Sequence, residues 1–204
     1  MLARRRAGKT ATKSSCRDHK EKIHVEQRSQ RNNYSLDNGK PIDYYFYDPD
    51  PGIVLNPPGT DKQVVEIQDA WPIADKISVN REGFEIKAFG GGFRDYDNDA
   101  AVKSVFYDQI IDVVKSHTGA KRVVLMELKY KERTGEIYVM RHDRQHKWYY
   151  FPRMKPDQAL LLKTYDSKTD GRARFTGHTT FKDSSTPPNA VKRESIEIRT
   201  MAFF

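Results

Sequence analysis

Short runs of strand-forming residues, each closed by a turn signal, dominate the chain. Val, Ile, Tyr, Phe and Trp concentrate in these runs, as is typical of β-strands. Gly, Pro and Asp residues separate the runs, and such residues end strands and form turns. The runs occupy residues 42–47, 63–68, 84–89, 121–126, 136–140, 146–151, 160–165, 175–181 and 194–203. About nine short strands predict a mainly β domain of the β-sandwich or jelly-roll type.

One stretch has helical rather than strand periodicity. Either Asn98 or Asp99 can cap its start, and Gly119 is placed where a C-terminal stop belongs. We therefore expect one main supporting helix near 98–118, packed against the sheet, followed by a buried strand at 121–126. The apolar residues that recur at helical spacing are Val102, Val105, Phe106, Ile110, Val113 and Val114.

The net charge of +8 is concentrated at one end of the chain. Residues 1–33 carry ten Lys/Arg and three Asp/Glu, whereas the remainder is nearly neutral. Basic segments of this composition are usually disordered and solvated. We therefore expect residues 1–40 to be a basic disordered tail and residues 41–204 to be a single domain. The tail lacks the interleaved aromatic residues of a single-strand binder, so nucleic acid is not expected as a partner.

Hydropathy and cysteine content give an expectation about location. No apolar run approaches the roughly 20 residues that span a bilayer, so no membrane partner is expected. The single cysteine, Cys16, excludes an internal disulfide and fits a cytoplasmic protein. A mitochondrial presequence is the alternative, because residues 1–15 are rich in Arg and hydroxyl groups and contain no acid. Few large apolar residues occur there to form one face of a presequence helix.

The C-terminal stretch 165–203 carries the residues best suited to chemistry. His178 lies in a Thr-Gly-His-Thr-Thr sequence, and it is either a hydrogen-bonded strand histidine or a metal ligand. Arg193 and Ser195 alternate along a predicted strand and therefore face the same side. A guanidinium can hold a carboxylate by two hydrogen bonds, and a hydroxyl adds another donor. A surface cross-strand ion pair is the alternative for this arginine.

Several longer motifs follow one another in a fixed order. The first half contains NREGFE (80–85), the helix with Asp112-Val113-Val114, and GAKRV (119–123). The second half contains HKWYYFPRM (146–154), LLKTYDS (161–167), DGRARFT (170–176) and RESIEIR (193–199). In these motifs the chain resembles the fungal and bacterial hydroxylase/desaturase family that includes gibberellin desaturase-like and cephem-methoxylase-related proteins. Only residues 1–40 or so lie outside the resemblance.

The resemblance implies a double-stranded β-helix oxygenase that uses non-haem Fe(II) and 2-oxoglutarate. Such enzymes hydroxylate or desaturate a small organic substrate, here a secondary metabolite. A His-x-Asp pair and a distal His bind the iron and leave three positions for 2-oxoglutarate and oxygen. The resemblance implies that His178 is the distal metal ligand and that Arg193, with Ser195, binds the far carboxylate of 2-oxoglutarate.

Three further residues are weaker candidates for contact with the substrate. Arg172 and Arg174 could each pair with an acidic side chain or reach a substrate carboxylate. Trp148 is one of the aromatic residues on which the shape of a pocket depends. The sequence does not fix whether its side chain points inward or outward.

The chain departs from the family pattern after Met126. In the family, the strand that matches 121–126 is followed by several dozen residues that hold the His-x-Asp pair. Here Met126 runs directly into Glu127, and the sequence that follows resembles the part beyond that segment. We infer an internal deletion near 126–127, from an incorrect gene model or alternative splicing, that leaves the jelly roll incomplete. A catalytically inactive family member or small-molecule binding module is the alternative to an active oxygenase.

Other acidic and histidine residues do not rebuild the iron site in the sequence. His-x-Glu occurs at 19–21 and 24–26, but both lie in the charged tail without a strand to orient them. His142 and Asp143 are adjacent, so on a strand they would face opposite sides. The deletion should also leave strand edges and apolar faces uncovered, and self-association through exposed edges is therefore expected.

Overall fold

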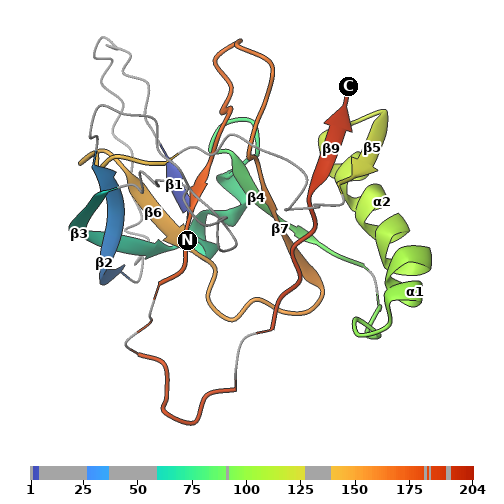
Figure 1. Cartoon of the computed structure of the whole chain (residues 1–204), viewed down its shortest axis with the longest axis horizontal. Helices are drawn as coiled ribbons and strands as arrows, with labels where there is room; N and C mark the ends of the chain where they lie inside the picture. Colours follow the sequence, from blue (N-terminus) through green and yellow to red (C-terminus); the bar gives the residue numbers. More distant parts are fainter. Residues whose placement is uncertain are drawn as a thin grey trace, which may run out of the picture. The chain divides into compact units, whose positions relative to one another are not determined.

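The structure is a computed structural model that describes residues 2–4, 27–36, 59–90, 92–126, 139–181, 183, 185–191 and 194–204. Its residues form two compact units, and each unit collects separate stretches of the chain. Unit 1 comprises Met1–Glu85, Glu136–Arg153 and Leu161–Lys182, and unit 2 comprises Ile86–Gly135, Met154–Leu160 and Asp183–Phe204. Figure 1 labels most of the helices and strands along the chain.

Unit 1 is built on a five-stranded sheet with the order β2-β3-β6-β1-β8. Strand β2 is antiparallel to β3 over ten residue pairs, and β3 runs parallel to β6. Strand β1 lies between β6 and β8 and is antiparallel to both. The strand bounds are β1 Leu2–Arg4, β2 Gln27–Leu36, β3 Gly59–Asp69, β6 Lys147–Tyr150 and β8 Gly177–His178.

The core of unit 1 follows from side-chain alternation in β3. Val65 and Ile67 are buried and their neighbours Val64 and Glu66 are exposed, as expected when one face of a strand meets the core. Trp148 of β6 joins this cluster and is 3% exposed. The full buried cluster consists of Tyr34, Val65, Ile67, Trp148 and Tyr150.

A short helical turn follows β3 and is tied to the sheet. The 3₁₀ helix η1, Trp71–Lys76, begins with Pro72 in its first turn, where a missing N–H costs nothing. The Trp71 indole donates to the Pro152 carbonyl oxygen at 2.8 Å, and its ring meets Phe151 edge-on at 5.0 Å. The Ala70 N–H donates to the Tyr150 carbonyl oxygen at 2.9 Å. These contacts hold the end of β3 and η1 beside β6.

Unit 2 contains the predicted helix as one continuous helical stretch. It consists of α1 (Asp99–Ala101), the π-helical η2 (Val102–Phe106) and α2 (Tyr107–Thr118). The Asn98 side chain accepts a hydrogen bond from the Ala101 N–H at 3.2 Å, and Gly119 ends α2 with a φ of 75°. The predicted helix and both of its end signals are confirmed. The buried residues of this helical stretch are Val102, Phe106 and Val114.

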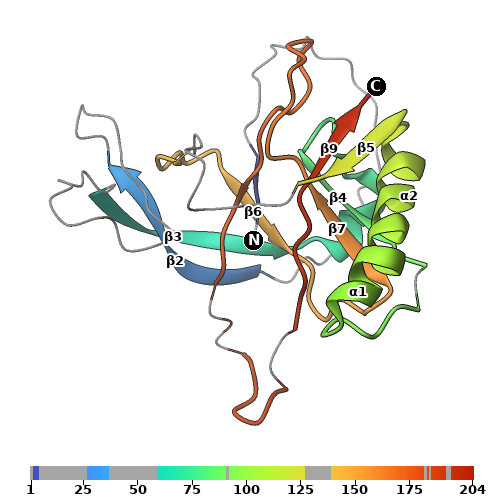
Figure 2. The same ribbon diagram turned by 45° about the vertical axis from the view of Figure 1, so that its right-hand side comes forward.

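Two short antiparallel strands accompany this helix in unit 2. Strand β5, Arg122–Leu125, pairs with β9, Thr200–Phe203, and α2 lies against β5 (Figure 2). The predicted strand at 121–126 is confirmed, but the expectation that it is buried is wrong. Of the β5 residues only Val123 is buried, because β5 has α2 on one side and pairs only with β9 among the described residues.

The remaining two-stranded sheet pairs β4, Phe84–Ala88, with β7, Gln158–Leu162. The boundary between the units falls within both strands, so each unit contains one end of this pair. In unit 2, β4 leads into a hydrophobic cluster of Phe89, Phe93, Val102 and Phe106. Phe89 and Phe106 meet edge-on at 5.6 Å, a favourable aromatic arrangement.

The described chain is thus mostly strands with one main helix, as predicted, and its sheets do not close into a barrel. The predicted strands at 63–68, 84–89 and 146–151 are confirmed as β3, β4 and β6. Two predictions were too long, because 175–181 contains only β8 and 194–203 contains only β9. Within 194–199 the side chains are mostly exposed, and a strand forms only where β5 supplies a partner.

Strand β2 lies inside the segment predicted to be a disordered tail. Its polar residues do not prevent a strand, because the backbone pairs with β3 along its whole length and Tyr34 enters the core. The predicted strand at 42–47, residues 136–138 of another, and most of the tail before residue 27 lie outside the described residues. No helix in the described part of the chain combines the length and apolar character needed to cross a membrane.

Candidate functional site

In unit 1, two segments far apart in the sequence are joined by backbone hydrogen bonds. The first is the turn 78–83, and the second runs from Lys163 to Thr176. The Lys163 N–H donates to the Gly83 carbonyl oxygen at 2.8 Å, and the Ala173 N–H donates to the Asn80 carbonyl oxygen at 2.7 Å. The second segment is closed on itself by the Thr176 N–H, which donates to the Lys163 carbonyl oxygen at 2.9 Å. We call this arrangement the loop clasp.

A glycine permits the closest approach within the loop clasp. Gly83 has a φ of 85°, a conformation that favours glycine. A Cβ atom at this position would lie 1.7 Å from the Thr176 hydroxyl oxygen. Thr176 is 6% exposed, and its hydroxyl donates to the Glu82 carbonyl oxygen at 3.4 Å. The absence of a side chain at Gly83 therefore allows Thr176 to be buried directly before β8.

Lys163 and Asp166 form a largely shielded ion pair within the loop clasp. The Lys163 ammonium donates to Asp166 at 2.7 Å and to the Asn80 side-chain oxygen at 2.9 Å. Burial alone would raise the pKa of Asp166. The hydrogen bonds from Lys163 and the Lys168 N–H, with the charges of Lys163 and Arg172, lower that pKa below its ordinary value.

Arg172 is paired with an acidic side chain, which is one of its two predicted roles. Its Nε and one terminal nitrogen donate to the two oxygens of Asp170 at 2.8 and 2.7 Å, in a bidentate geometry. This hydrogen bonding lowers the pKa of Asp170 from 3.8 to about 2 and raises the pKa of Arg172. Its other terminal nitrogen lies 3.9 Å from Asp166. Asp170 therefore already takes two of the five N–H donors of the guanidinium, on one edge of that group.

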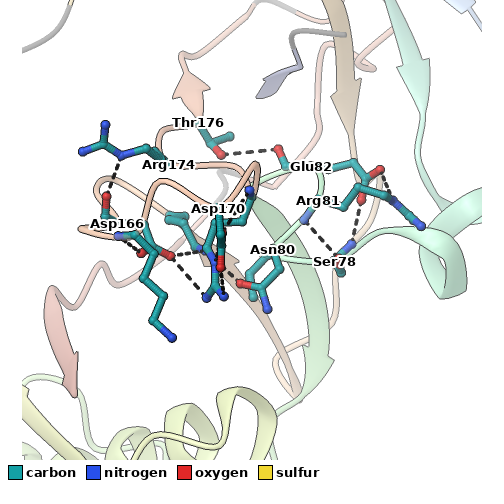
Figure 3. A network of polar contacts seen from close by, with 12 residues as sticks. Ser78, Asn80, Arg81, Glu82, Asp166, Asp170, Arg174 and Thr176 are labelled. Carbon is teal, nitrogen blue, oxygen red and sulfur yellow. Dashed lines mark hydrogen bonds and ion pairs between the residues drawn. The ribbon is translucent and has the colours of Figure 1, made fainter. Parts of the chain in front are cut away.

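Arg174 is placed differently from Arg172. Its Nε donates to the backbone carbonyl oxygen of Asp166 at 2.8 Å. The guanidinium lies 5.6 Å from the centre of the Tyr165 ring and 5.4 Å from that of Phe175. Figure 3 shows its terminal nitrogens directed away from the side chains of Asp166 and Asp170. Among the described residues no carboxylate pairs with Arg174.

His178 lies on the surface at the end of the loop clasp. It belongs to β8, is exposed, and pairs in register with Leu2 of β1. Its Nδ1 is 3.4 Å from the Thr176 carbonyl oxygen. In the tautomer protonated at Nδ1, this nitrogen would donate to that carbonyl and Nε2 would keep its lone pair. Metal-binding histidines commonly donate from one ring nitrogen in this way and ligate with the other.

The structure describes two of the three remaining predicted site residues, Trp148 and Ser195. Trp148 is buried in the core of unit 1, where its indole donates to the Tyr34 hydroxyl at 2.6 Å. Burial raises the pKa of Tyr34 despite this hydrogen bond and one with Asn32. Ser195 is exposed in unit 2, whereas His178 belongs to unit 1. Arg193 lies outside the described residues.

The described residues do not fit a complete iron site. No three His, Cys, Asp or Glu side chains come together in the described part of the chain to hold a metal ion. Two histidines pack instead against Tyr34, His142 edge-on at 5.0 Å and His146 stacked at 5.9 Å. Asp143 accepts a hydrogen bond from the Gln145 N–H in a turn. His178 is therefore a single candidate ligand without partners among these residues.

The sequence reasoning assigned no role to Asn80, Lys163 or Asp166, which hold the loop clasp together. Their only signal was membership of the NREGFE and LLKTYDS motifs. The contact between Asn80 and Lys163 joins residues 83 positions apart. No spacing rule for helices or strands brings together residues at that separation. The closeness of Gly83 and Thr176 was hidden for the same reason.

Comparison of the sequence with protein families gives one match in two parts. A sequence model of the family described as oxidoreductase/YMDC permease-like domain matches residues 32–129 and again residues 124–203. Together the two matches span most of the chain. They overlap at 124–129, which includes the position of the inferred deletion.

Curated relatives are similar over part of the chain. Hydroxylase/desaturase asaB of Aspergillus flavus is 57% identical over 58 residues, which are 28% of this chain and 26% of that protein. Hydroxylase/desaturase efuI of Hormonema carpetanum is 53% identical over 60 residues, 29% of this chain and 20% of that protein. The Fe(II)/2-oxoglutarate-dependent dioxygenase nvfI of Aspergillus novofumigatus is 32% identical over 77 residues, 37% and 27% of the two chains. The matches span about a quarter of the length of these relatives.

Solved structures resemble the chain over a larger part of its length. A structure of the iron and alpha-ketoglutarate-dependent endoperoxidase NvfI, described as being in a different conformation, has a TM-score of 0.75 and 18% identity. The match covers 87% of this chain and 98% of the other. A second structure of the same endoperoxidase has a TM-score of 0.70 at 18% identity, with the same coverage. At this level of identity the likeness concerns the fold.

Proposed function

The chain belongs to the oxidoreductase/YMDC permease-like domain family, and on this basis we propose that it is an oxidoreductase of the non-haem Fe(II)/2-oxoglutarate hydroxylase/desaturase type. Its proposed substrate is a small organic molecule of secondary metabolism. The observation that carries this proposal is the 57% identity over 58 residues with a hydroxylase/desaturase. The TM-score of 0.75 with an iron and alpha-ketoglutarate-dependent endoperoxidase supports it at the level of fold.

The proposed fold is an incomplete double-stranded β-helix that has lost a segment near 126–127. The two-part family match supports this, since an uninterrupted member would be expected to match in one piece. The exposed side of β5, which ends at Leu125, is also what such a loss would leave behind. The proximal His-x-Asp pair is proposed to belong to the lost segment.

The proposed roles of individual residues follow from this assignment. His178 is proposed as the distal ligand of Fe(II), and the Thr176 carbonyl oxygen beside its Nδ1 supports ligation through Nε2. Arg193, with Ser195, is proposed to bind the far carboxylate of 2-oxoglutarate. Arg174 is better placed than Arg172 to meet a substrate carboxylate, because Asp170 already occupies the Arg172 guanidinium.

A second candidate function is a catalytically inactive relative that binds a small molecule. One observation favours it, namely that the described residues bring no three metal-binding side chains together. In this case the loop clasp would serve as a scaffold for ligand binding and no oxidation would follow. The two candidates share their fold and differ in whether iron is bound.

Loading the purified chain with Fe(II) and 2-oxoglutarate under anaerobic conditions separates the two candidates. An oxygenase gives a metal-to-ligand charge-transfer band, and it releases succinate after oxygen is admitted. His178→Ala should abolish the band if His178 is a ligand, and His117→Ala, a helix-end histidine, is the control. Neither a band nor succinate from this chain would exclude catalysis by this form and favour the binding module.

The transcript across Met126–Glu127 provides an independent test of the lost segment. An in-frame insertion with a His-x-Asp sequence would restore the enzyme, and the longer protein should then gain the charge-transfer band. A transcript that encodes the present junction without alternatives would contradict a gene-model error.

We further propose a cytoplasmic location, from the single cysteine, and self-association through uncovered strand edges.

A further inference from the structure

A partly open hollow of about 330 Å³ lies on unit 1 beside the turn 78–83. Its volume is at the lower end of the range of roughly 300–1,000 Å³ for small-molecule sites. None of the site residues predicted from the sequence belongs to it. The residues that line it are Ile73, Lys76, Ile77, Arg81, Glu82 and Tyr149.

The apolar part of the hollow is held in place by the sheet. Tyr149 belongs to β6 and is 6% exposed, and its ring lies 6.0 Å from the fully buried Phe84. Ile77 is also 6% exposed, and Ile73 belongs to η1, which the Trp71 indole ties to the Pro152 carbonyl oxygen just after β6. A ligand would therefore meet a surface that is already formed, which lowers the ordering cost of binding.

The polar part of the hollow carries one buried carboxylate and two cations. The Glu82 side chain is 5% exposed, and it accepts hydrogen bonds from the Ser78 N–H at 2.9 Å and from the Arg81 Nε at 2.6 Å. Figure 3 shows the terminal nitrogens of Arg81 directed away from Glu82. Lys76 is exposed, and no carboxylate pairs with it among the described residues. Arg81 balances Glu82, so the hollow keeps one net positive charge.

We propose that this hollow binds a small organic acid that bears one carboxylate on an apolar or aromatic body. The carboxylate meets Lys76 and the terminal nitrogens of Arg81, and the body lies on Ile73, Ile77 and Tyr149. A dicarboxylate would bring a second negative charge next to an apolar wall and the Glu82 carboxylate, which is unfavourable. Binding of the acid is argued from the lining residues alone. Only the further step, that this acid represents the substrate class, rests on the proposed function.

Binding of 2-naphthoate tests the proposal, with its neutral analogue 2-naphthamide as the matched ligand. Both are titrated against the full chain by ligand-observed NMR and calorimetry, with EDTA present and without iron. We expect 2-naphthoate to bind about tenfold more tightly than the amide at low salt, because two partly exposed cations contribute modestly each. The difference should shrink as salt is raised. Absence of iron makes the result independent of whether the chain is an oxygenase.

Two lysine variants localise the charge. Lys76→Gln should weaken 2-naphthoate about fivefold and leave 2-naphthamide unchanged. Lys103→Gln removes an exposed lysine of η2 in unit 2 and should leave both affinities unchanged. Ile73→Ser should weaken both ligands, because it removes apolar contact without removing charge. Thermal unfolding of each variant establishes that it is folded.

Several results would overturn the proposal. Equal affinity for acid and amide would remove the role of charge, and equal effects of Lys76→Gln and Lys103→Gln would place binding elsewhere. Displacement of 2-naphthoate by an equal concentration of 2-oxoglutarate would assign the hollow to a dicarboxylate instead. No detectable binding of 2-naphthoate by the folded chain would refute the site, while leaving the iron and succinate measurements of the proposed function unaffected.

Discussion

The loop clasp of unit 1 and the β5–β9 sheet of unit 2 differ in how closely their side chains are packed. In the clasp, Gly83 and Thr176 are in close contact, and Lys163 is held by Asn80 and Asp166. In the sheet, Val124 and Met201 pair across the strands while 43% and 46% exposed. The clasp uses specific short-range bonds, whereas the sheet presents apolar side chains to solvent.

This difference agrees with the proposed loss of a segment near 126–127. The clasp joins motifs on both sides of the junction, and its contacts are complete without any further segment. The β5–β9 sheet ends where the two family matches overlap, at 124–129. Exposed large apolar side chains on one sheet face usually mark a surface that another segment or partner covers. The loop clasp can therefore be well packed even if the β5–β9 sheet has lost a covering segment.

The strongest test of the comparison replaces by alanine one phenylalanine directly after the first segment of the loop clasp and one in the β5–β9 sheet. Phe84 is fully buried in unit 1, so Phe84→Ala should lower the free energy of unfolding by roughly 3–5 kcal/mol. Phe203 of β9 is 39% exposed and contacts the Arg122 guanidinium at 4.4 Å, so Phe203→Ala should cost about 1 kcal/mol. Urea denaturation followed by circular dichroism measures both. Equal losses would contradict the contrast between a closed and an open region.

The next largest effect is expected at two glycines with similar backbone conformations. Gly83 and Gly119 have φ values of 85° and 75°, but a Cβ atom at Gly119 would meet nothing within 4 Å. Gly119→Ala should therefore cost about 1 kcal/mol from backbone strain alone. Gly83→Ala should cost about 2–4 kcal/mol, because the new methyl group also displaces Thr176.

A double substitution sharpens this second prediction. In a Thr176→Ala background the hydroxyl that opposes the new methyl group is gone, so Gly83→Ala should cost less than in the original chain. The difference between the two costs is the coupling energy of the close contact. A cost at Gly83 equal to that at Gly119, or no coupling with Thr176, would refute the close packing of the loop clasp.

Local rules predicted the elements whose signals lie within one segment. Asn98 and Gly119 marked the helix ends, because capping depends on neighbouring residues only. Runs of strand-forming residues separated by turn-forming residues marked β3, β4 and β6. Strand β2 was missed because its sequence QRSQRNNYSL has no apolar alternation, and its partner β3 lies beyond a long connection.

The site was predicted less completely than the fold, because its contacts are long-range. Trp148 was a candidate for substrate contact whose direction the sequence did not fix, and the structure shows its indole donating to Tyr34, 114 residues away, in the core. Arg172 and Arg174 are both arginines and lie two positions apart in the sequence. Only the structure distinguishes them, through the carboxylate of Asp170 on Arg172 and the two rings beside Arg174.

A smaller effect should appear in the acid stability of the loop clasp. The pKa of Asp170 is lowered to about 2, below its ordinary 3.8, so its ionised form stabilises the fold. This contribution is present above pH 4 and disappears as the pH falls through 2. Asp170→Asn should therefore be less stable than the original chain at pH 6, and the gap should close between pH 4 and pH 2.

Asp112→Asn, on the exposed side of α2, provides the control for this pH dependence. Urea midpoints measured between pH 2 and pH 6 compare the three proteins. We expect Asp112→Asn to follow the original chain at each pH. A gap between Asp170→Asn and the original chain that persists unchanged at pH 2 would assign the loss to packing and not to the ion pair with Arg172.

The smallest effect on stability, and the most direct test of the open region, concerns the apolar face of β5–β9. Val124→Ser and Met201→Ser should each change the free energy of unfolding by less than about 0.5 kcal/mol, because both residues are nearly half exposed on the sheet surface. They should nevertheless reduce the proposed self-association, which sedimentation velocity experiments measure. Val191→Ser is the matched control, since Val191 is 95% exposed but belongs to no strand. A monomeric original chain, or association by all three variants equal to that of the original chain, would refute the proposal that the apolar face of β5–β9 mediates self-association.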